Sequence, residues 1–559
     1  MYKSTRNPMF RSSFAEDIFN QKYSHEDCET YAALCEVLVH DVCEGLMTGD
    51  EMEQLIEYMV KMYFIPGGRY LYYAGRDRKF FNNCFLLKAE EDTREDWAEL
   101  SKKTELCLST GGGIGVDYSI YRPSGSTLFG TGGVASGPLA KMQMVNEIGR
   151  GIIQGGSRRS ALYASLGWKH GDVYDFLRIK NWHDIAVAGT GGKTVADLKE
   201  ANFDFRAPMD MTNISVNYDT DWLMRYWETG EVGDVFKTNV HQAIATGEPG
   251  FSFNFFGQEG ETLRNACCEV TSSDDSDVCN LGSINLGRID SILELRDVIR
   301  LATKFLVCGS LRAHLPYDKV NAVREKNRRL GLGLMGIHEW LLKKGLGYEV
   351  TGELKRWLSV YRDVSRSVAT GFAAKLSVSN PVACRAIAPT GSIGILAGTT
   401  TGIEPLFAVA YKRRYLKGTR WHHQYVVDSV AQQMIEEYSV DPEKIDSALS
   451  LVDNFERRIT VQADVQDFVD MAISSTINLP KWTPDKAENG FVAHFTDVLA
   501  KHAHRLRGFT VYPDGSRGGQ PLTAVPYKEA KDKLGEAFEE SVEAVDICDI
   551  TGKGGVCGV

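Results

Sequence analysis

The stretch "RNACCEVTSSDDSDVCNLGSINLGR", residues 264–288, decides how the rest of the chain is interpreted. Asn265, Cys267 and Glu269 stand at alternate positions in its first half. A second cysteine follows Cys267 directly, and Cys279 lies twelve residues after Cys267. The second half, "VCNLGSINL", is typical of a buried strand that ends in a turn. Three interpretations are open: a metal site, a buried apolar cluster, or chemistry that needs free thiols beside a carboxylate.

The cysteine spacing disfavours a metal site. Zinc sites commonly use pairs spaced Cys-x2-4-Cys, whereas Cys267 and Cys268 are adjacent and no second pair or histidine cluster lies nearby. Catalysis would combine a reactive thiol with Glu269 as a base and Asn265 as a hydrogen-bonding partner of a substrate hydroxyl. Cys279 could pair with a cysteine of a neighbouring strand, where Cβ atoms approach to about 4 Å. Cys84, in "FNNCFLL", is the candidate partner.

The remaining cysteines fit a reducing compartment. The chain has 12 cysteines among 559 residues, and their spacing is not that of a secreted disulfide framework. A cysteine in a reduced protein is by default a small buried hydrophobe. We predict this role for the cysteines in helix-like or apolar contexts, which are Cys28, Cys35, Cys43, Cys107, Cys308 and Cys384.

The composition indicates a globular protein, with 43% hydrophobic and 25% charged residues. A net charge of -11 disfavours binding to nucleic-acid polymers or acidic membranes, although small nucleotides need only local donors. No segment is an uninterrupted apolar span, and the start lacks the apolar core of a signal peptide. We therefore expect a cytoplasmic protein with no membrane segment.

The chain divides into three predicted parts. The first 64 residues have a helical pattern, in which Ser24 with Asp27 and Thr48 with Glu51 resemble capping boxes. Short apolar strands then alternate with helical patterns, which is typical of an α/β architecture with largely parallel strands. The glycine-rich end has nothing to pack and is expected to be mobile. The predicted boundaries are 1–64, 65–525 and 526–559.

Three glycine-rich motifs permit two interpretations each. "GGGIG", residues 111–115, suits either a phosphate loop or close backbone packing. "APTGSIGILAG", residues 388–398, contains a place where free backbone amides could open a helix and bind phosphate. "QGGSRRSA", residues 154–161, places Arg158 and Arg159 in a loop that either grips an anion or is simply solvated. Spacing alone favours the solvated loop.

The motifs together resemble the catalytic subunit of ribonucleotide reductase over almost the whole chain. The short interval from Cys267 to Cys279, "GIEPLFAVAYKRRY" and "VYPDGSRGG" resemble the adenosylcobalamin-dependent class II enzymes. Eight motifs occur in the family's order: "PGGRYL", "FNNCF", "GGGIGVDYS", "QGGSRRSA", "NACCE", "CNLGSINL", "APTGSIGILAGTTTGIEP" and "TVYPDGSRGGQPL".

The resemblance implies a ten-stranded α/β barrel of two parallel half-sheets, with a central finger loop that carries the radical cysteine. The short helical segment precedes this barrel. The family's Asn-x-Cys-x-Glu pattern falls on Asn265, Cys267 and Glu269, so Cys268 is assigned to packing. Cys84 and Cys279 match the redox pair on adjacent strands.

Two further segments match functional segments of the family. The substrate-phosphate segment falls on Pro389, Thr390, Gly391, Ser392 and Ile393. The loop that relays effector identity falls on Gln154, Gly155, Gly156, Ser157 and Arg158.

The resemblance also implies a radical reaction. A thiyl radical on Cys267 takes the 3′-hydrogen of a ribonucleotide, Glu269 removes the 3′-hydroxyl proton, and the 2′-hydroxyl leaves as water. Cys84 and Cys279 supply the electrons and form a disulfide. Cys548 and Cys557 in the tail then pass electrons from a thioredoxin- or glutaredoxin-like reductant. Eight residues separate these two cysteines, against two or four in many family tails, so their order of attack stays open.

Allosteric control is expected in part. The helix at 136–153 and the loop after it match the dimer and effector region, which implies a homodimer whose specificity responds to dNTPs and ATP. No ATP-cone pattern occurs in residues 1–64, so the sequence predicts no general inhibition by dATP.

Other interpretations are weaker. A class I-like subunit would receive its radical from a separate ferritin-like subunit through a tyrosine relay, but Tyr512 lacks the second tyrosine usual there. "GVCGV" superficially resembles the glycyl-radical motif of class III, against which Glu269 and Cys279 argue. An inactive nucleotide-binding barrel would not need the full set of Cys84, Asn265, Cys267, Glu269 and Cys279. The choice between diphosphate and triphosphate substrates stays open, and the compact length suits a bacterial or phage-encoded protein.

Overall fold

Strand β11, Asp277–Asn285, joins two sets of parallel strands in the computed structural model. Every residue of β11 is buried, as expected for a strand covered on both faces. It runs parallel to β12, Leu330–Met335, and its first residues pair antiparallel with β2, Cys84–Lys88. The structure describes residues 10–130, 132–154, 158–202, 204–417, 420–484, 486, 490–515, 522–535 and 537–539.

The first set contains five strands, each parallel to the next. The chain runs out along each strand and returns through a crossover, as the alternating sequence pattern predicts. These strands are β2, β3 (Gly113–Asp117), β6 (Leu162–Gly167), β7 (Thr212–Asp219) and β8 (Gly250–Asn254).

The second set closes the barrel. The segment 383–387 forms backbone hydrogen bonds with β12 on one side and with 471–474 on the other. The chain then continues into β15, Thr476–Leu479, which is parallel to β16, Gly508–Pro513. β16 pairs antiparallel with β8 of the first set. Two parallel half-sheets therefore meet at two antiparallel seams, and the predicted α/β barrel is confirmed.

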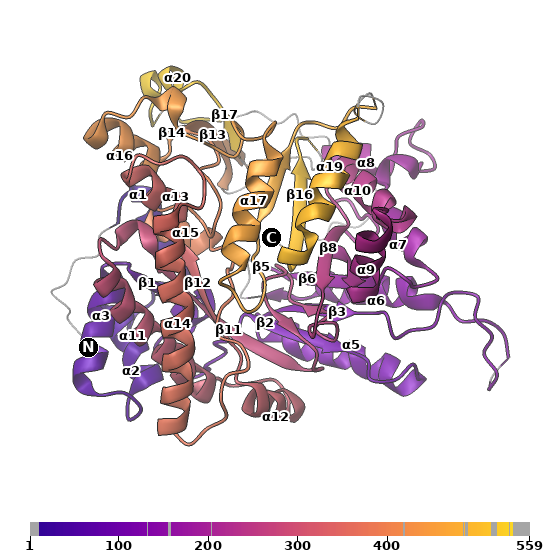
Figure 1. Ribbon diagram of the computed structural model, residues 1–559, viewed down its shortest axis with the longest axis horizontal. Coiled ribbons are helices and arrows are strands. Elements are labelled where there is room, and N and C mark those ends of the chain that lie inside the picture. The colour runs from indigo at the N-terminus through magenta and orange to yellow at the C-terminus, as the bar shows by residue number, and fades with distance from the viewer. Residues whose placement is uncertain are drawn as a thin grey trace.

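Helices cover the outside of the barrel (Figure 1). Helices α11 (Ile292–Arg312) and α14 (Gly352–Lys375) lie on one side together with the N-terminal helices. On the other side lie α5 (Arg94–Ser109), α6 (Gly137–Gly151), α9 (Thr220–Thr229) and α10 (Asp234–Thr246). No helix within the described ranges is both long and apolar enough to cross a membrane.

The N-terminal segment is helical, and one of its two predicted caps is wrong. Thr48 caps α3 (Gly49–Val60) by accepting from the Glu51 amide at 3.3 Å, as predicted. Ser24 and Asp27 cap nothing, because residues 25–28 form a backbone-paired turn. Instead α2 (Tyr31–Cys43) begins after Thr30, whose hydroxyl accepts from the Ala33 amide. Together with α1 (Ser13–Lys22), these helices share one hydrophobic core with α11 and α14.

Helix α6 is shorter than the helix predicted over residues 136–153, and a small hairpin follows it. The helix ends at Gly151, and Ile153–Gln154 (β4) pairs with Arg158–Arg159 (β5). Gln154 and Arg158 are register partners in this small hairpin. Gly155, Gly156 and Ser157 lie outside the described residues.

Part of the segment predicted as a mobile tail has regular structure. Helix α20, Tyr527–Asp532, is anchored by the buried Ala530. Strand β18, Ala537–Glu539, pairs with β14, Arg420–Val427. Apolar contacts hold α20 against the sheet of β13 (Ala410–Lys417), β14 and β17 (Leu522–Ala524), so the segment predicted to start at residue 526 begins with a packed helix. Cys548 and Cys557 lie outside the described residues.

Candidate active site

A finger loop carries Asn265, Cys267 and Glu269 into the barrel. The chain enters through β9, Leu263–Arg264, and leaves through β10, Thr271–Ser272, which pair antiparallel. Asn213 of β7 donates from its side chain to the Ala266 carbonyl at 2.9 Å. The Ala472 amide, from the opposite half-sheet, donates to the Glu269 carbonyl at 2.8 Å. The loop is therefore held from both half-sheets.

Glycines in β3 make room for the finger loop. A Cβ atom on Gly115 would lie 1.6 Å from the Arg264 carbonyl oxygen, and one on Gly113 would lie 3.2 Å from the Ala266 Cβ. No side chain fits at the first of these positions. Of the two interpretations of "GGGIG", close backbone packing is therefore the one these contacts support.

The tip of the loop is a tight turn that separates the two adjacent cysteines. The Cys268 amide donates to the Asn265 carbonyl at 2.9 Å, and Cys268 has a φ of +70°. This left-handed conformation is uncommon for a residue with a side chain. Cys268 is buried, whereas Cys267 is exposed. The burial of Cys268 is consistent with the packing role predicted for it.

Asn265 connects the loop tip to Cys84. Its side-chain amide donates to the Cys84 sulfur at 3.0 Å, and its Oδ1 accepts from the Val270 amide at 2.9 Å. Both ends of the Asn265 side chain are thus fixed, which sets the distance between the loop and β2.

Glu269 is a buried carboxyl group beside a thiol. It is 1% exposed, and the Cys84 thiol lies 4.0 Å from its Oε1. Burial raises the pKa of Glu269 from 4.5 to about 7. Its Oε2 has no hydrogen-bond partner among the residues that the structure describes. A carboxyl group with a pKa near neutrality and a free oxygen can take up or release a proton at physiological pH.

Cys84 and Cys279 lie opposite one another on the two strands of an antiparallel seam. Cys84 of β2 and Cys279 of β11 are direct register partners, and both are buried. Burial raises the pKa of both thiols well above the ordinary value. They are therefore protonated and can act as hydrogen donors. Neighbouring strands bring such a pair within reach of a disulfide.

The segment from Pro389 to Ile393 opens a short helix. Thr390 has a φ of +51°, and its hydroxyl accepts from the Gly402 amide at 2.8 Å. Helix α15, Gly391–Ala397, starts directly after it. The first-turn amides of a helix have no intrahelical partners, so this segment can bind an anionic group.

These elements line one cavity of about 300 Å³. Cys84, Asn265, Cys267 and Glu269 contribute to its wall together with residues 389–393. Cys279 does not line it and lies behind Cys84 in β11. Sequence reasoning missed several lining residues, although the motifs "PGGRYL" and "FNNCF" contain some of them. The missed residues are Tyr23, Gly67, Gly68, Asn83, Gly113, Ala161, Ala266, Leu281, Gly282, Ser283 and Ala388.

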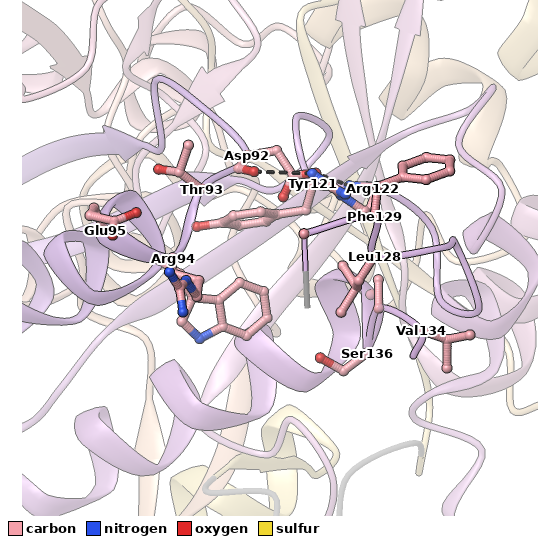
Figure 2. A pocket seen from close by; sticks show the side chains of 14 residues that line it. Asp92, Thr93, Arg94, Glu95, Tyr121, Arg122, Leu128, Phe129, Val134 and Ser136 are labelled. Carbon is pink, nitrogen blue, oxygen red and sulfur yellow. Dashed lines mark hydrogen bonds and ion pairs between the residues drawn. The ribbon is translucent and has the colours of Figure 1, made fainter. Parts of the chain in front are cut away.

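A second cavity, of about 570 Å³, lies between the start of α5 and the loop before α6 (Figure 2). Arg122 donates through Nε to Asp92 at 2.5 Å, and Figure 2 shows this pair at the upper wall with Arg94 across the cavity. Phe129 is 94% exposed in the loop beside it. Two guanidinium groups and apolar side chains thus surround an open space.

The sequence matches the family described as "Ribonucleotide reductase, barrel domain" over residues 82–356 and 382–497. A vitamin B12-dependent ribonucleoside-diphosphate reductase of Mycobacterium tuberculosis strain H37Rv is 27% identical, and the match covers 91% of this chain and 76% of that protein. The enzyme of the same description from Thermoplasma acidophilum is 26% identical, with 89% and 69% covered.

The fold has solved counterparts. The class Id ribonucleotide reductase alpha subunit of Actinobacillus ureae superposes with a TM-score of 0.68 at 16% identity, covering 92% of this chain and 99% of that chain. This likeness concerns the fold alone. The family match spans more than half of the sequence and includes the finger loop. The chain belongs to the ribonucleotide reductase family and contains its barrel domain.

Proposed function

We propose that this chain reduces ribonucleotides to 2′-deoxyribonucleotides as a class II enzyme, with adenosylcobalamin as the radical source. The observation that carries the proposal is the finger loop, which places Cys267 and Glu269 in one cavity with Cys84. A thiol, a carboxyl group of near-neutral pKa and a pair of protonated thiols are the groups that this reduction requires.

The proposed reaction gives each group a defined role. The Cys267 thiyl radical takes the 3′-hydrogen, while Glu269 accepts the 3′-hydroxyl proton. The 2′-hydroxyl leaves as water after protonation by a thiol of the Cys84–Cys279 pair. These two thiols provide two electrons and become a disulfide, and Cys267 returns its hydrogen to C3′. One ribonucleotide and two thiols thus give one deoxyribonucleotide, one disulfide and one water.

The exposure of Cys267 fits a radical source that reaches it from outside. Cys267 is the exposed cysteine among those of the described residues, where the other cysteines are buried. Adenosylcobalamin, when bound, would supply the radical that removes the hydrogen atom of the Cys267 thiol. The chain's own contribution is to present that sulfur at the cavity wall while Asn265 and Ala472 hold the loop in place.

The relatives and β16 both favour cobalamin over a partner subunit. The relatives from M. tuberculosis and T. acidophilum are named vitamin B12-dependent. Tyr512 in β16 is followed by Pro513, so the position beside it has no phenol to extend a tyrosine relay. A class I-like subunit remains the alternative that the experiment below separates.

The substrate and reductant are proposed from the same resemblance. The 389–393 segment would take the phosphates through backbone amides and hydroxyl groups. Cys548 and Cys557 would reduce the Cys84–Cys279 disulfide by thiol exchange and receive electrons from a thioredoxin-like protein. We further propose a homodimer formed through α6 and the segment that follows it.

The second cavity is the proposed effector site. It lies at the start of α6, and the hairpin of β4 and β5 follows the end of that helix. Arg94 and Arg122 could meet nucleotide phosphates there. Arg94→Ala should leave basal turnover intact but weaken the effect of dNTPs on substrate preference at least tenfold. An unchanged effect of dNTPs on the substrate preference of this variant would show that the effector site lies elsewhere.

Anaerobic turnover of ribonucleotides by the purified chain with dithiothreitol tests the main proposal. We expect deoxyribonucleotide formation only when adenosylcobalamin is present, and none by Cys267→Ala. The variant Cys268→Ala is the matched control, because its side chain packs rather than reacts, and it should retain activity. Activity restored only by a metal-loaded partner subunit would contradict class II, and inactivity with every radical source would favour the inactive barrel.

A further inference from the structure

The active-site cavity receives one side chain from outside the barrel, that of Tyr23. This residue is the C-cap of α1, and its amide donates to the Phe19 carbonyl at 2.9 Å. Tyr23 is only 5% exposed, yet it lines the cavity that contains Cys267 and Ser392. A Cβ atom on Gly68 would lie 3.1 Å from the Tyr23 hydroxyl oxygen. The absence of a side chain at Gly68 leaves that phenol oxygen at the cavity wall.

The N-terminal segment also contacts the helix proposed to take the phosphates. Helix α1 packs against α15. Arg11 donates through Nη1 to the Gly398 carbonyl, just after α15, at 3.0 Å. The same guanidinium forms an ion pair with the buried Glu339 at 2.8 Å, and Glu339 in turn accepts from Thr399. The segment Arg11–Tyr23 is therefore fixed to the far end of α15 and reaches the cavity with Tyr23.

The composition of the cavity wall limits how a phosphate can be bound. No lysine or arginine occurs among the described residues that line it. Phosphate oxygens must then be met by neutral donors, which are backbone amides and hydroxyl groups. The hydroxyl groups on the wall belong to Tyr23, Ser283, Thr390 and Ser392. Of these, the phenol has the longest reach, and it extends from the helix that lies on α15.

We infer that the Tyr23 hydroxyl donates a hydrogen bond to a phosphate of the bound ribonucleotide, so that α1 completes the substrate site. This inference rests on the proposed function, because it takes a ribonucleotide as the ligand of the cavity. Tyr23 is then a substrate-binding residue that acts on affinity, and the N-terminal segment is part of the active site rather than only a cover of the barrel.

Equilibrium binding of a ribonucleoside diphosphate, a ribonucleoside triphosphate and the unphosphorylated ribonucleoside would test the inference. We expect Tyr23→Phe to weaken binding of the phosphorylated ligands about ten- to a hundredfold, which is the effect of losing a hydrogen bond to a charged group. Binding of the nucleoside should not change, and in turnover KM should rise with kcat within about twofold. Tyr31→Phe is the matched control, because Tyr31 packs in the core against Phe10 and Phe19 and does not line the cavity.

Each outcome has a defined meaning. Equal loss for nucleotide and nucleoside would place the hydroxyl at the sugar or base and overturn the phosphate contact. No loss in Tyr23→Phe, with nucleotides still bound by the unmodified chain, would overturn the inference and leave the proposed function intact. No nucleotide binding by the unmodified chain would instead contradict the proposed function. If Tyr23→Phe does not melt like the unmodified protein, Gly68→Ala serves as the second variant, since its methyl group displaces the phenol oxygen and should weaken nucleotide binding in the same way.

Discussion

Glu269 is the residue whose chemistry depends most directly on its surroundings. An exposed glutamate is fully ionised at neutral pH and is a weak base, whereas the barrel interior raises the pKa of Glu269 to about 7. The carboxyl group is then half protonated near physiological pH, which suits alternate uptake and release of a proton. The desolvation that causes the shift comes from the closure of the barrel around the finger loop.

The pH dependence of turnover should report this group. If ionised Glu269 accepts the 3′-hydroxyl proton, kcat should rise as the pH increases through about 7 and become constant above it. Glu269→Gln should remove this rise and lower kcat by about 10²- to 10⁴-fold, the usual contribution of a general base. A rapid-quench pH series with both proteins measures this, and an unchanged profile in the variant would assign the base elsewhere.

The same group should make stability depend on pH. Its pKa is raised from 4.5 in the unfolded chain to about 7 in the folded one, so the folded state holds the proton more tightly. The contribution of Glu269 protonation to the free energy of unfolding is fully present below pH 4.5 and is lost as the pH rises through about 7. Glu269→Gln avoids this loss, which is about 3 kcal/mol, or about 2–3 °C in Tm. Melting curves at pH 5 and pH 8 should show that the Tm of Glu269→Gln, relative to the Tm of the original chain, is higher at pH 8 than at pH 5. An equal Tm difference at both pH values would contradict the assignment.

At the scale of elements, the position of the finger loop depends on glycine in β3. Gly115 lies directly against the Arg264 carbonyl, so the main chains of β3 and of the loop touch without side chains between them. Turn geometry at Cys268 and the Asn265 hydrogen bonds then aim Cys267 at the cavity. The catalytic geometry is thus set by main-chain contact between two elements.

Gly115→Ala should move the loop and inactivate the enzyme. The added methyl group would cost about 1–3 kcal/mol by overpacking, and a displacement of about 1 Å can lower turnover by 10²-fold. Gly371→Ala is the control, because no atom lies within 4 Å of a Cβ added at Gly371 in α14. That variant should be as active and at least as stable as the original chain. Retained turnover in Gly115→Ala would contradict the claim that the position of the finger loop depends on glycine at this site.

At the scale of the whole molecule, the N-terminal helices and one side of the barrel share a core. Leu38 in α2 is fully buried within the cluster that contains Phe305 of α11 and Trp357 of α14. Such shared burial couples the unfolding of the helices to that of the barrel. The N-terminal part is therefore a structural part of the barrel's covering layer, with Tyr23 at the cavity as its second role.

Leu38→Ala should destabilise the barrel as a whole. The lost side chain and the cavity left behind cost about 2–5 kcal/mol. We expect one unfolding transition at a lower Tm, measured both by circular dichroism and by loss of nucleotide binding. Leu293→Ala, at a position that is 77% exposed, should change the free energy of unfolding by no more than about 0.5 kcal/mol. An early separate transition for the N-terminal helices would contradict a shared core.

The sequence by itself determined the class of fold and the residue types available for the proposed site. Alternation of strands and helices predicts an α/β architecture with largely parallel strands. The resemblance carried by the ordered motifs implies the two half-sheets and proposes Cys84, Asn265, Cys267, Glu269 and Cys279 as site residues. These features are local or follow from matched motifs, so they can be read from residue order. The helix caps are not fixed by residue order alone: Ser24 and Asp27 have the cap spacing, yet residues 25–28 form a backbone-paired turn and α2 is capped by Thr30.

Only the tertiary structure decided which residues distant in the sequence lie beside one another. The pairing of Cys84 with Cys279, the contact of Gly115 with Arg264 and the arrival of Tyr23 at the cavity join residues far apart in the chain. The near-neutral pKa of Glu269 also arises from burial by many elements at once. Distances and desolvation depend on the closed barrel, whereas residue type and periodicity are properties of the chain itself. The sequence therefore determined which chemical groups are present, and the fold decided their geometry.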